Sequence, residues 1–216
     1  MLIFRENNKN VVTIIIDYLM NNNRIIRIAI VTVWFVAVFL FWRFACWGLI
    51  NYHEEMQMFL FTPSFFKNSV CTVGGFADYM TQFLVQFFVN YSIGAVIVAA
   101  NVVLVQILSF GVVRRITSSS IGFALSFIPS VAALCVIGYF ETMLTALVSI
   151  VIGLAFVCLL LNIKRIDVHI IATFVLGLVA YFIAGSAAML ITILCTAACD
   201  LATKSIKAKV ALLMSV

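Results

Sequence analysis

Long apolar stretches separated by short polar ones run through most of this sequence. An apolar segment of about 17–25 residues is long enough to cross the hydrocarbon core of a bilayer as a helix. Four stretches meet this length, and a fifth is too long for one perpendicular helix and is interrupted at Gly185-Ser186. Two helices that meet in a tight turn at these small residues would account for the length of the fifth stretch. The total is then six predicted helices. The predicted helices cover residues 25–50, 82–113, 121–139, 143–163 and the two halves of 168–199.

The composition supports a membrane protein. Apolar types make up 65% of the 216 residues and charged types 10%, against roughly 25% charged residues in soluble domains. The mean hydropathy is +1.23. So few charges could not cover the surface of a water-soluble monomer, and so much apolar content excludes a disordered chain. The sequence therefore predicts an all-α fold, a polytopic transmembrane helix bundle of about six spans.

The basic residues indicate how the bundle is oriented. If six helices cross the membrane, eleven of the thirteen fall on one side, which the positive-inside rule identifies as cytoplasmic. The exceptions are Arg43 and Lys67. We expect a cytoplasmic segment at 1–24, a transmembrane domain at 25–203 with an outer loop at 51–81, and a cytoplasmic tail at 204–216. The net charge of +5 then reflects topology, and no nucleic-acid partner is expected. The eleven are Arg5, Lys9, Arg24, Arg27, Arg114, Arg115, Lys164, Arg165, Lys204, Lys207 and Lys209.

The outer loop carries most of the candidate chemistry. His53, Glu54 and Glu55 follow the first predicted helix directly. A carboxylate there could act as a general base toward an acceptor hydroxyl or help to hold a divalent cation, and the alternative is an ordinary solvated loop. Further along, Thr62-Pro63 is typical of a helix N-cap followed by proline at the first helical position. The phenylalanines around it favour a short helix lying in the membrane interface.

A polar stripe is predicted on the second helix. Asp78, Gln82, Gln86 and Asn90 recur every four residues and would share one helix face. Because lipid offers no hydrogen-bond partners, such a stripe should face protein or water. It could line a substrate groove beneath the outer loop, or it could make interhelical hydrogen bonds. We take Asp78, Gln82 and Gln86, with His53, as candidate substrate-binding residues.

The remaining polar positions carry weaker signals. His169, at the start of the fifth helix, is expected at the surface. Cys46 and Cys71 could both face outside, which leaves a disulfide between them open. No nucleotide-binding or hydrolase motif is found and no metal site is predicted, since Cys195 and Cys199 lack further ligands. No cofactor can be assigned.

Three strings carry a resemblance to a known family. They are YHEEMQMF at 52–59, GGFADYMTQF at 74–83 and YFIAGSAAML at 181–190. Together they resemble an uncharacterised family of bacterial multi-pass membrane proteins, a domain of unknown function, over roughly residues 24–200. The resemblance implies a bacterial inner membrane and the topology above, and it implies no reaction.

A more distant similarity is to the GT-C glycosyltransferases, which use lipid-phosphate-linked sugars. These enzymes place an acidic residue or pair in the first outer loop, where it serves as base or metal ligand. The resemblance implies catalytic roles for Glu54 and Glu55, which hold that position here, and makes Asp78 a second polar contributor. Arg43, near the outer interface, could meet the lipid phosphate. GT-C enzymes normally have more helices and often a further outer domain, so this chain would be a relative or a shortened version.

Three functions are consistent with these patterns. The first is a GT-C-like transferase that binds a polyprenyl-phosphate lipid. The second is a non-catalytic scaffold or partner subunit that docks another membrane protein through the outer loop. The third is a small transporter, which should show broken helices or paired repeats near the midplane, and neither is visible in the sequence.

Overall fold

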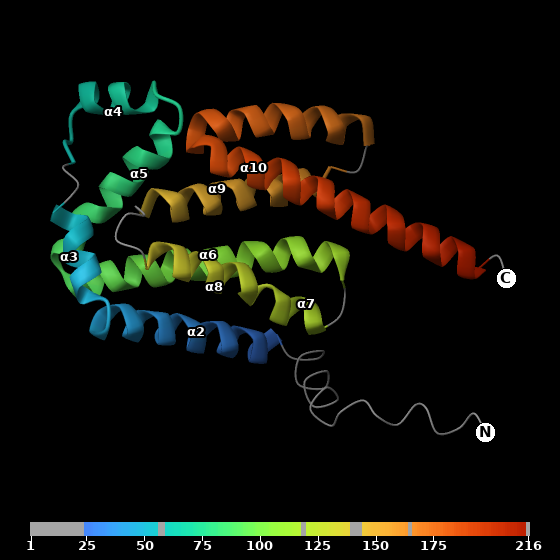
Figure 1. Cartoon of the computed structure of the whole chain (residues 1–216), viewed down its shortest axis with the longest axis horizontal. Helices are drawn as coiled ribbons and strands as arrows, with labels where there is room; N and C mark the ends of the chain where they lie inside the picture. Colours follow the sequence, from blue (N-terminus) through green and yellow to red (C-terminus); the bar gives the residue numbers. More distant parts are fainter. Residues whose placement is uncertain (1–23, 56–58, 118–119, 139–143, 164–165, 215–216) are drawn as a thin grey trace.

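The computed structural model describes residues 24–55, 59–117, 120–138, 144–163 and 166–214 (Figure 1). All regular elements in these ranges are helical, which confirms the all-α prediction. The predicted segment 1–24 and the basic pair Lys164-Arg165 lie outside the described residues, except for Arg24. The elements are α2 (Arg24–Phe44), α3 (Trp47–Glu55), α4 (Pro63–Val70), α5 (Gly75–Val85), η1 (Gln86–Val89), α6 (Tyr91–Ile116), α7 (Ser120–Leu125), α8 (Phe127–Ile137), α9 (Leu144–Leu160) and α10 (Ile166–Met214).

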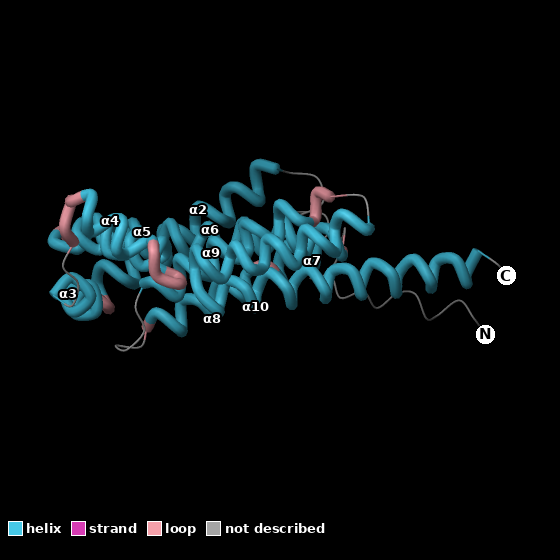
Figure 2. Tube along the Cα trace, turned by 90° about the horizontal axis from the view of Figure 1, so that it is seen from above, coloured by secondary structure: helices cyan, strands magenta, loops and turns pink. Residues whose placement is uncertain are grey.

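The long helices run side by side, and the short helices α3, α4 and α5 gather at one end (Figure 1). We call the end formed by α3, α4 and α5 the cap end, and the opposite end, toward the two chain termini, the tail end (Figure 1). Viewed at right angles, the last part of α10 extends past the other helices toward the C-terminus (Figure 2).

α6 lies at the centre of the bundle, packed against α2, α8 and α9. It is buried through small side chains such as Ala95, Ala99 and Val102. Small residues let helix backbones approach closely, which is how helices associate in lipid. Polar side chains add links between helices: Trp34 Nε1 donates to Ser130 Oγ at 3.1 Å, and Ser130 Oγ donates to the Val102 carbonyl at 3.0 Å.

The tight turn predicted at Gly185-Ser186 is confirmed. Gly185 has φ 80° and ψ −172°, a conformation essentially restricted to glycine, and it divides α10 into two antiparallel halves (Figure 1). We call the part of α10 before Gly185 its first half and the part after Gly185 its second half. The two halves pack closely, since a Cβ added at Gly177 would touch the Ile193 side chain.

Three of the predicted helices are divided in the structure. The first was expected over 25–50, but α2 ends at Phe44 and a separate helix, α3, begins at Trp47. The second was expected over 82–113, but Asn90 leaves the helical conformation and its Oδ1 accepts from Ser92 N at 3.0 Å. Asparagine is among the best N-cap residues because its side chain satisfies a free backbone N–H. The continuous stripe through Asn90 is therefore wrong. The third, expected over 121–139, is divided at Ser126 into α7 and α8.

Helices suited to a membrane form much of the fold. In the described part of the chain, three are long and apolar enough to span: Ile25–Phe44, Tyr91–Ile116 and Val168–Ala202, the last containing the Gly185 turn. Ile121–Ile137 and Leu144–Leu160 are apolar but shorter. Large apolar side chains cover the outside of the bundle, such as Phe174 and Leu194 on α10. A surface of this kind is typical of contact with lipid or with another protein.

Candidate functional site

At the cap end, Arg43 reaches the start of α6. It lies in the last turn of α2, and the break after Phe44 leaves its side chain beside the first turn of α6. Arg43 Nε donates to Ser92 Oγ at 2.9 Å, and its guanidinium carbon lies 5.6 Å from the Phe44 ring centroid. The other guanidinium nitrogens give the fork that suits a phosphate or carboxylate. Arg43 is half-buried and so is held in one place at the rim of the bundle.

Glu55 reaches the same helix start from α3. Asn51 Nδ2 donates to Glu55 Oε1 at 2.7 Å across one turn of α3. Tyr91 Oη in turn makes a long hydrogen bond of 3.5 Å to Asn51 Oδ1. The Trp47 ring packs edge-on against Tyr91, with 6.3 Å between the ring centroids. A cation and a carboxylate are thus connected to two successive residues of α6. We call Arg43, Asn51, Glu55, Tyr91 and Ser92 the α6-start site.

His53 and Glu54 lie next to the α6-start site in α3 and differ in burial. Glu54 is half-exposed next to Glu55, so either carboxylate is open to a ligand. His53 is only 3% exposed, and burial lowers the pKa of its imidazole below the ordinary 6.5. The ring is therefore neutral at pH 7, because burial disfavours the charged form. Its role as a substrate contact stays a prediction, and the positive charge near this site comes from Arg43.

The predicted polar stripe runs along α5 into η1 and ends at Asn90. Asp78 is exposed and Gln82 half-exposed on α5, which packs against α9 and α10. Gln86 is exposed at the start of η1, which packs against α3, and its backbone N–H still bonds the Gln82 carbonyl one turn back. Asp78, Gln82 and Gln86 therefore lie one turn apart on a continuous helical path, and the stripe ends at Asn90, which caps α6. A substrate role for any of them stays a prediction.

α4 carries a cluster of aromatic rings at the cap end. Its start is the one predicted: Thr62 is the N-cap, its Oγ1 accepts from Phe65 N at 3.3 Å, and Pro63 follows. The Phe59 ring contacts Tyr79 and Phe83 of α5 at centroid distances of 5.2 and 5.8 Å. No residue of α4 is buried, and Phe61 just before it is 83% exposed. This arrangement is typical of a helix lying in a membrane interface.

Two glycines tie the cap to the hairpin. Gly74 N donates to the Phe182 carbonyl at 3.0 Å, and a side chain on Gly74 would lie 3.3 Å from Gly185 N. Gly74 has φ 76°, so both residues adopt positive φ. Gly75 is more confined still, since a Cβ there would lie 1.7 Å from the Ser69 carbonyl oxygen. The strings GGFADY and YFIAGSAAML, far apart in the sequence, therefore meet through their glycines.

Most of the chain matches one protein family. A sequence profile for a family of unknown function matches residues 23–216. The chain belongs to DUF6057. This confirms the resemblance to an uncharacterised family, and the DUF6057 region includes the α6-start site and both glycine strings. Neither the comparison with curated proteins nor that with solved structures finds a match.

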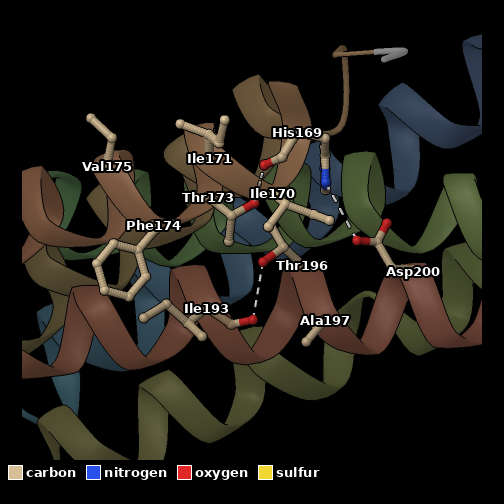
Figure 3. A pocket seen from close by; sticks show the side chains of 10 residues that line it. All are labelled: His169, Ile170, Ile171, Thr173, Phe174, Val175, Ile193, Thr196, Ala197 and Asp200. Atoms are coloured by element: carbon tan, nitrogen blue, oxygen red, sulfur yellow. Dashed lines mark hydrogen bonds and ion pairs between the residues drawn. The ribbon is translucent and has the colours of Figure 1, made fainter. Parts of the chain in front are cut away.

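A groove in this DUF6057 chain lies along the α10 hairpin toward the tail end (Figure 3). It has a volume of about 570 Å³, and apolar residues such as Ile170 and Phe174 line most of it. His169 Nδ1 lies 3.4 Å from Asp200 Oδ2 across the hairpin. The expectation of a surface position for His169 is wrong, because the antiparallel hairpin buries its ring against the second half of α10.

Several residues of the α6-start site are not predicted from the sequence. Asn51, Tyr91 and Ser92 carry no motif, and only the spacing of four between Asn51 and Glu55 on a helix could have linked that pair. Cys46 and Cys71 are free thiols, so the disulfide left open from sequence is not formed. Among the described residues, no three of His, Cys, Asp or Glu are grouped to hold a metal.

Proposed function

We propose that this chain is a six-span protein of the bacterial inner membrane with both termini in the cytoplasm. The spans would be α2, α6, α7 with α8, α9, and the two halves of α10. The distribution of basic residues supports this: Arg27, Arg114 and Arg115 lie at the tail end, and the cap end holds Arg43 and Lys67 (Figure 1). By the positive-inside rule the tail end is cytoplasmic and the cap faces out.

Thiol labelling tests this topology. Cys71, between α4 and α5, is exposed at the cap end. We expect a membrane-impermeant maleimide to label it in intact spheroplasts, and a Cys71→Ser variant to lose most of the label. Labelling of Cys71 only after the membrane is permeabilised would reverse the proposed orientation.

For activity, we propose that the α6-start site binds a polyprenyl-phosphate lipid that carries a sugar, and transfers the sugar as a GT-C-like enzyme or a shortened relative does. The observation that supports this is the connection of Arg43 and Glu55 to successive residues, Ser92 and Tyr91. A cation and a carboxylate beside a membrane rim are the two charges that such a transfer uses.

The chemical step follows from these charges. Arg43 would bind the phosphate and stabilise the negative charge that builds up on it as the bond between the sugar carbon and the phosphate oxygen breaks. Glu55 or Glu54 would accept the proton of the acceptor hydroxyl as its oxygen bonds to the sugar carbon. The products are the glycosylated acceptor, the free lipid phosphate and a protonated carboxyl group. Asn51 would hold the Glu55 side chain in position.

Lipid mass spectrometry on protein purified in native-lipid discs tests this proposal. We expect wild type to be enriched in polyprenyl-phosphate lipid, and Arg43→Gln to lower the enrichment at least about tenfold, since a hydrogen bond to a charged group contributes about 1.5–3 kcal/mol. Glu54→Gln and Glu55→Gln should retain the lipid, with the sugar-loaded form increased in the variant that lacks the base.

The matched control is Lys67→Gln, which removes the same charge at the cap end without touching the α6-start site. An equal loss in this variant would assign the effect to general surface charge. Bulk phospholipid alone in every sample would overturn lipid-phosphate binding and favour a non-catalytic scaffold or partner subunit. The exposed Phe61, just before α4, and Phe66, within α4, support that second function. Their replacement by serine would then disrupt association with the partner membrane protein.

A further inference from the structure

We infer that the groove between α2, α6 and α7 at the tail end binds one anionic phospholipid, with its phosphate on Arg27 and Arg114. This site is separate from the α6-start site, which lies at the opposite end of the bundle (Figure 1). The inference does not depend on the proposed transfer activity.

The groove combines a charged end with apolar walls. Its volume is about 400 Å³, within the range of small-molecule sites. Arg27 and Arg114 line it together with Ile28, Val31, Ile107 and Phe110. The Arg27 guanidinium carbon lies 5.6 Å from the Phe110 ring centroid, which favours a guanidinium placed flat against the groove wall.

The order of these residues along the helices matches the shape of a lipid. α2 and α6 run in opposite directions, so Arg27 near the start of α2 and Arg114 near the end of α6 lie at the same end (Figure 1). From Arg114, Phe110 lies one helical turn, about 6 Å, deeper, and Ile107 lies further in. From Arg27, Val31 lies one turn deeper on α2. A headgroup at the arginines would therefore place an acyl chain along these apolar side chains.

Charge complementarity favours an anionic headgroup. Among the described residues, no carboxylate lines the groove. Of the carboxylate side chains that the structure describes, Glu54, Glu55 and Asp78 lie at the cap end, and Asp200 faces His169 on the α10 hairpin. Basic pockets between membrane helices on the cytoplasmic side are a known means of binding anionic lipid headgroups.

The apolar walls identify a lipid as the occupant, because a soluble anion would use the arginines alone. Ile28 is 60% exposed and Ile107 49% exposed, on the lipid-facing side of the bundle. An acyl chain in contact with these side chains and a phosphate on the arginines would use the whole groove.

Native mass spectrometry tests the inference on the full chain in mixed micelles of detergent, dioleoylphosphatidylcholine and dioleoylphosphatidylglycerol. We expect wild type to retain one phosphatidylglycerol in preference to phosphatidylcholine. Arg27→Gln and Arg114→Gln should each lower its retention about fivefold, as about 1 kcal/mol per basic residue implies. Arg114→Lys, which keeps the charge, should retain most of the binding.

Arg115→Gln is the matched control, because Arg115 neighbours Arg114 but donates its Nη2 to Asn162 instead of lining the groove. An equal loss in Arg115→Gln would assign retention to general charge and overturn the site. Equal retention of phosphatidylcholine, or no bound lipid, would also overturn it. Thermal unfolding of each variant, expected within a few degrees of wild type, separates lost binding from lost folding. Failure of the transfer proposal would show instead in Arg43→Gln, which leaves this groove intact.

Discussion

A Gly75→Ala variant is expected to lose about 3 kcal/mol of stability, the upper end of the cost of overpacking. The added Cβ would lie 1.7 Å from the Ser69 carbonyl oxygen and 2.4 Å from Thr72 Oγ1. The nearest atom belongs to the backbone, so no change of rotamer relieves the clash. The corner between α4 and α5 would have to open. Thermal unfolding in detergent, followed by circular dichroism, should show a midpoint lowered by about 6–12 °C.

The matched control is Gly48→Ala in α3, where an added Cβ meets nothing within 4 Å. This variant should unfold at or slightly above the wild-type temperature, because alanine is the better helix former. A Gly75→Ala midpoint equal to that of Gly48→Ala would mean that the corner is not packed as described.

Gly185→Ala is expected to cost about 2 kcal/mol for a different reason. Here an added Cβ would meet only Gly74 Cα, at an ordinary 3.9 Å, so there is no clash. The cost comes from φ 80° with ψ −172°, a region that side-chain-bearing residues rarely adopt at about 1–3 kcal/mol. The same thermal measurement should show a midpoint lowered by about 4–8 °C.

A Gly185→Asn variant tests whether Gly185 adopts this region or the ordinary left-handed helical region. Asparagine tolerates the left-handed helical region but not the region that Gly185 occupies. We therefore expect the asparagine variant to be as unstable as the alanine variant. Recovery of stability with asparagine would contradict the described turn.

Local signals in the sequence predicted much of the fold. Gly185-Ser186 in an overlong apolar stretch gave the hairpin, and Thr62-Pro63 gave the start of α4. The break at Asn90 was missed because a polar residue every four positions suits a continuous stripe as well as a helix cap. The choice between them depends on packing: the buried Phe88 and the close contact of Gly94 with Ile50 fix the bent path.

The candidate site was predictable only in part. Arg43 and Glu55 were identified by their charge and their place beside the first helix. The connection between Arg43 and Glu55 could not be predicted, because it runs through Tyr91 and Ser92, which lie on another helix. His169 shows the opposite case: Gly185 lies almost midway between His169 and Asp200, so the predicted hairpin already implied that the two would meet.

The glycine contact also has a consequence for the order of assembly. Gly74 and Gly185 close a long loop of chain, and contacts of high sequence separation form late because of the entropy lost on closure. The hydrogen bond from Gly74 to Phe182 cannot form until the α10 hairpin has been synthesised. The α4–α5 corner therefore packs against the α10 hairpin late in folding, although its residues are synthesised before α10. A chain interrupted before α10 would carry every residue of the α6-start site and still lack the support that holds the cap in place.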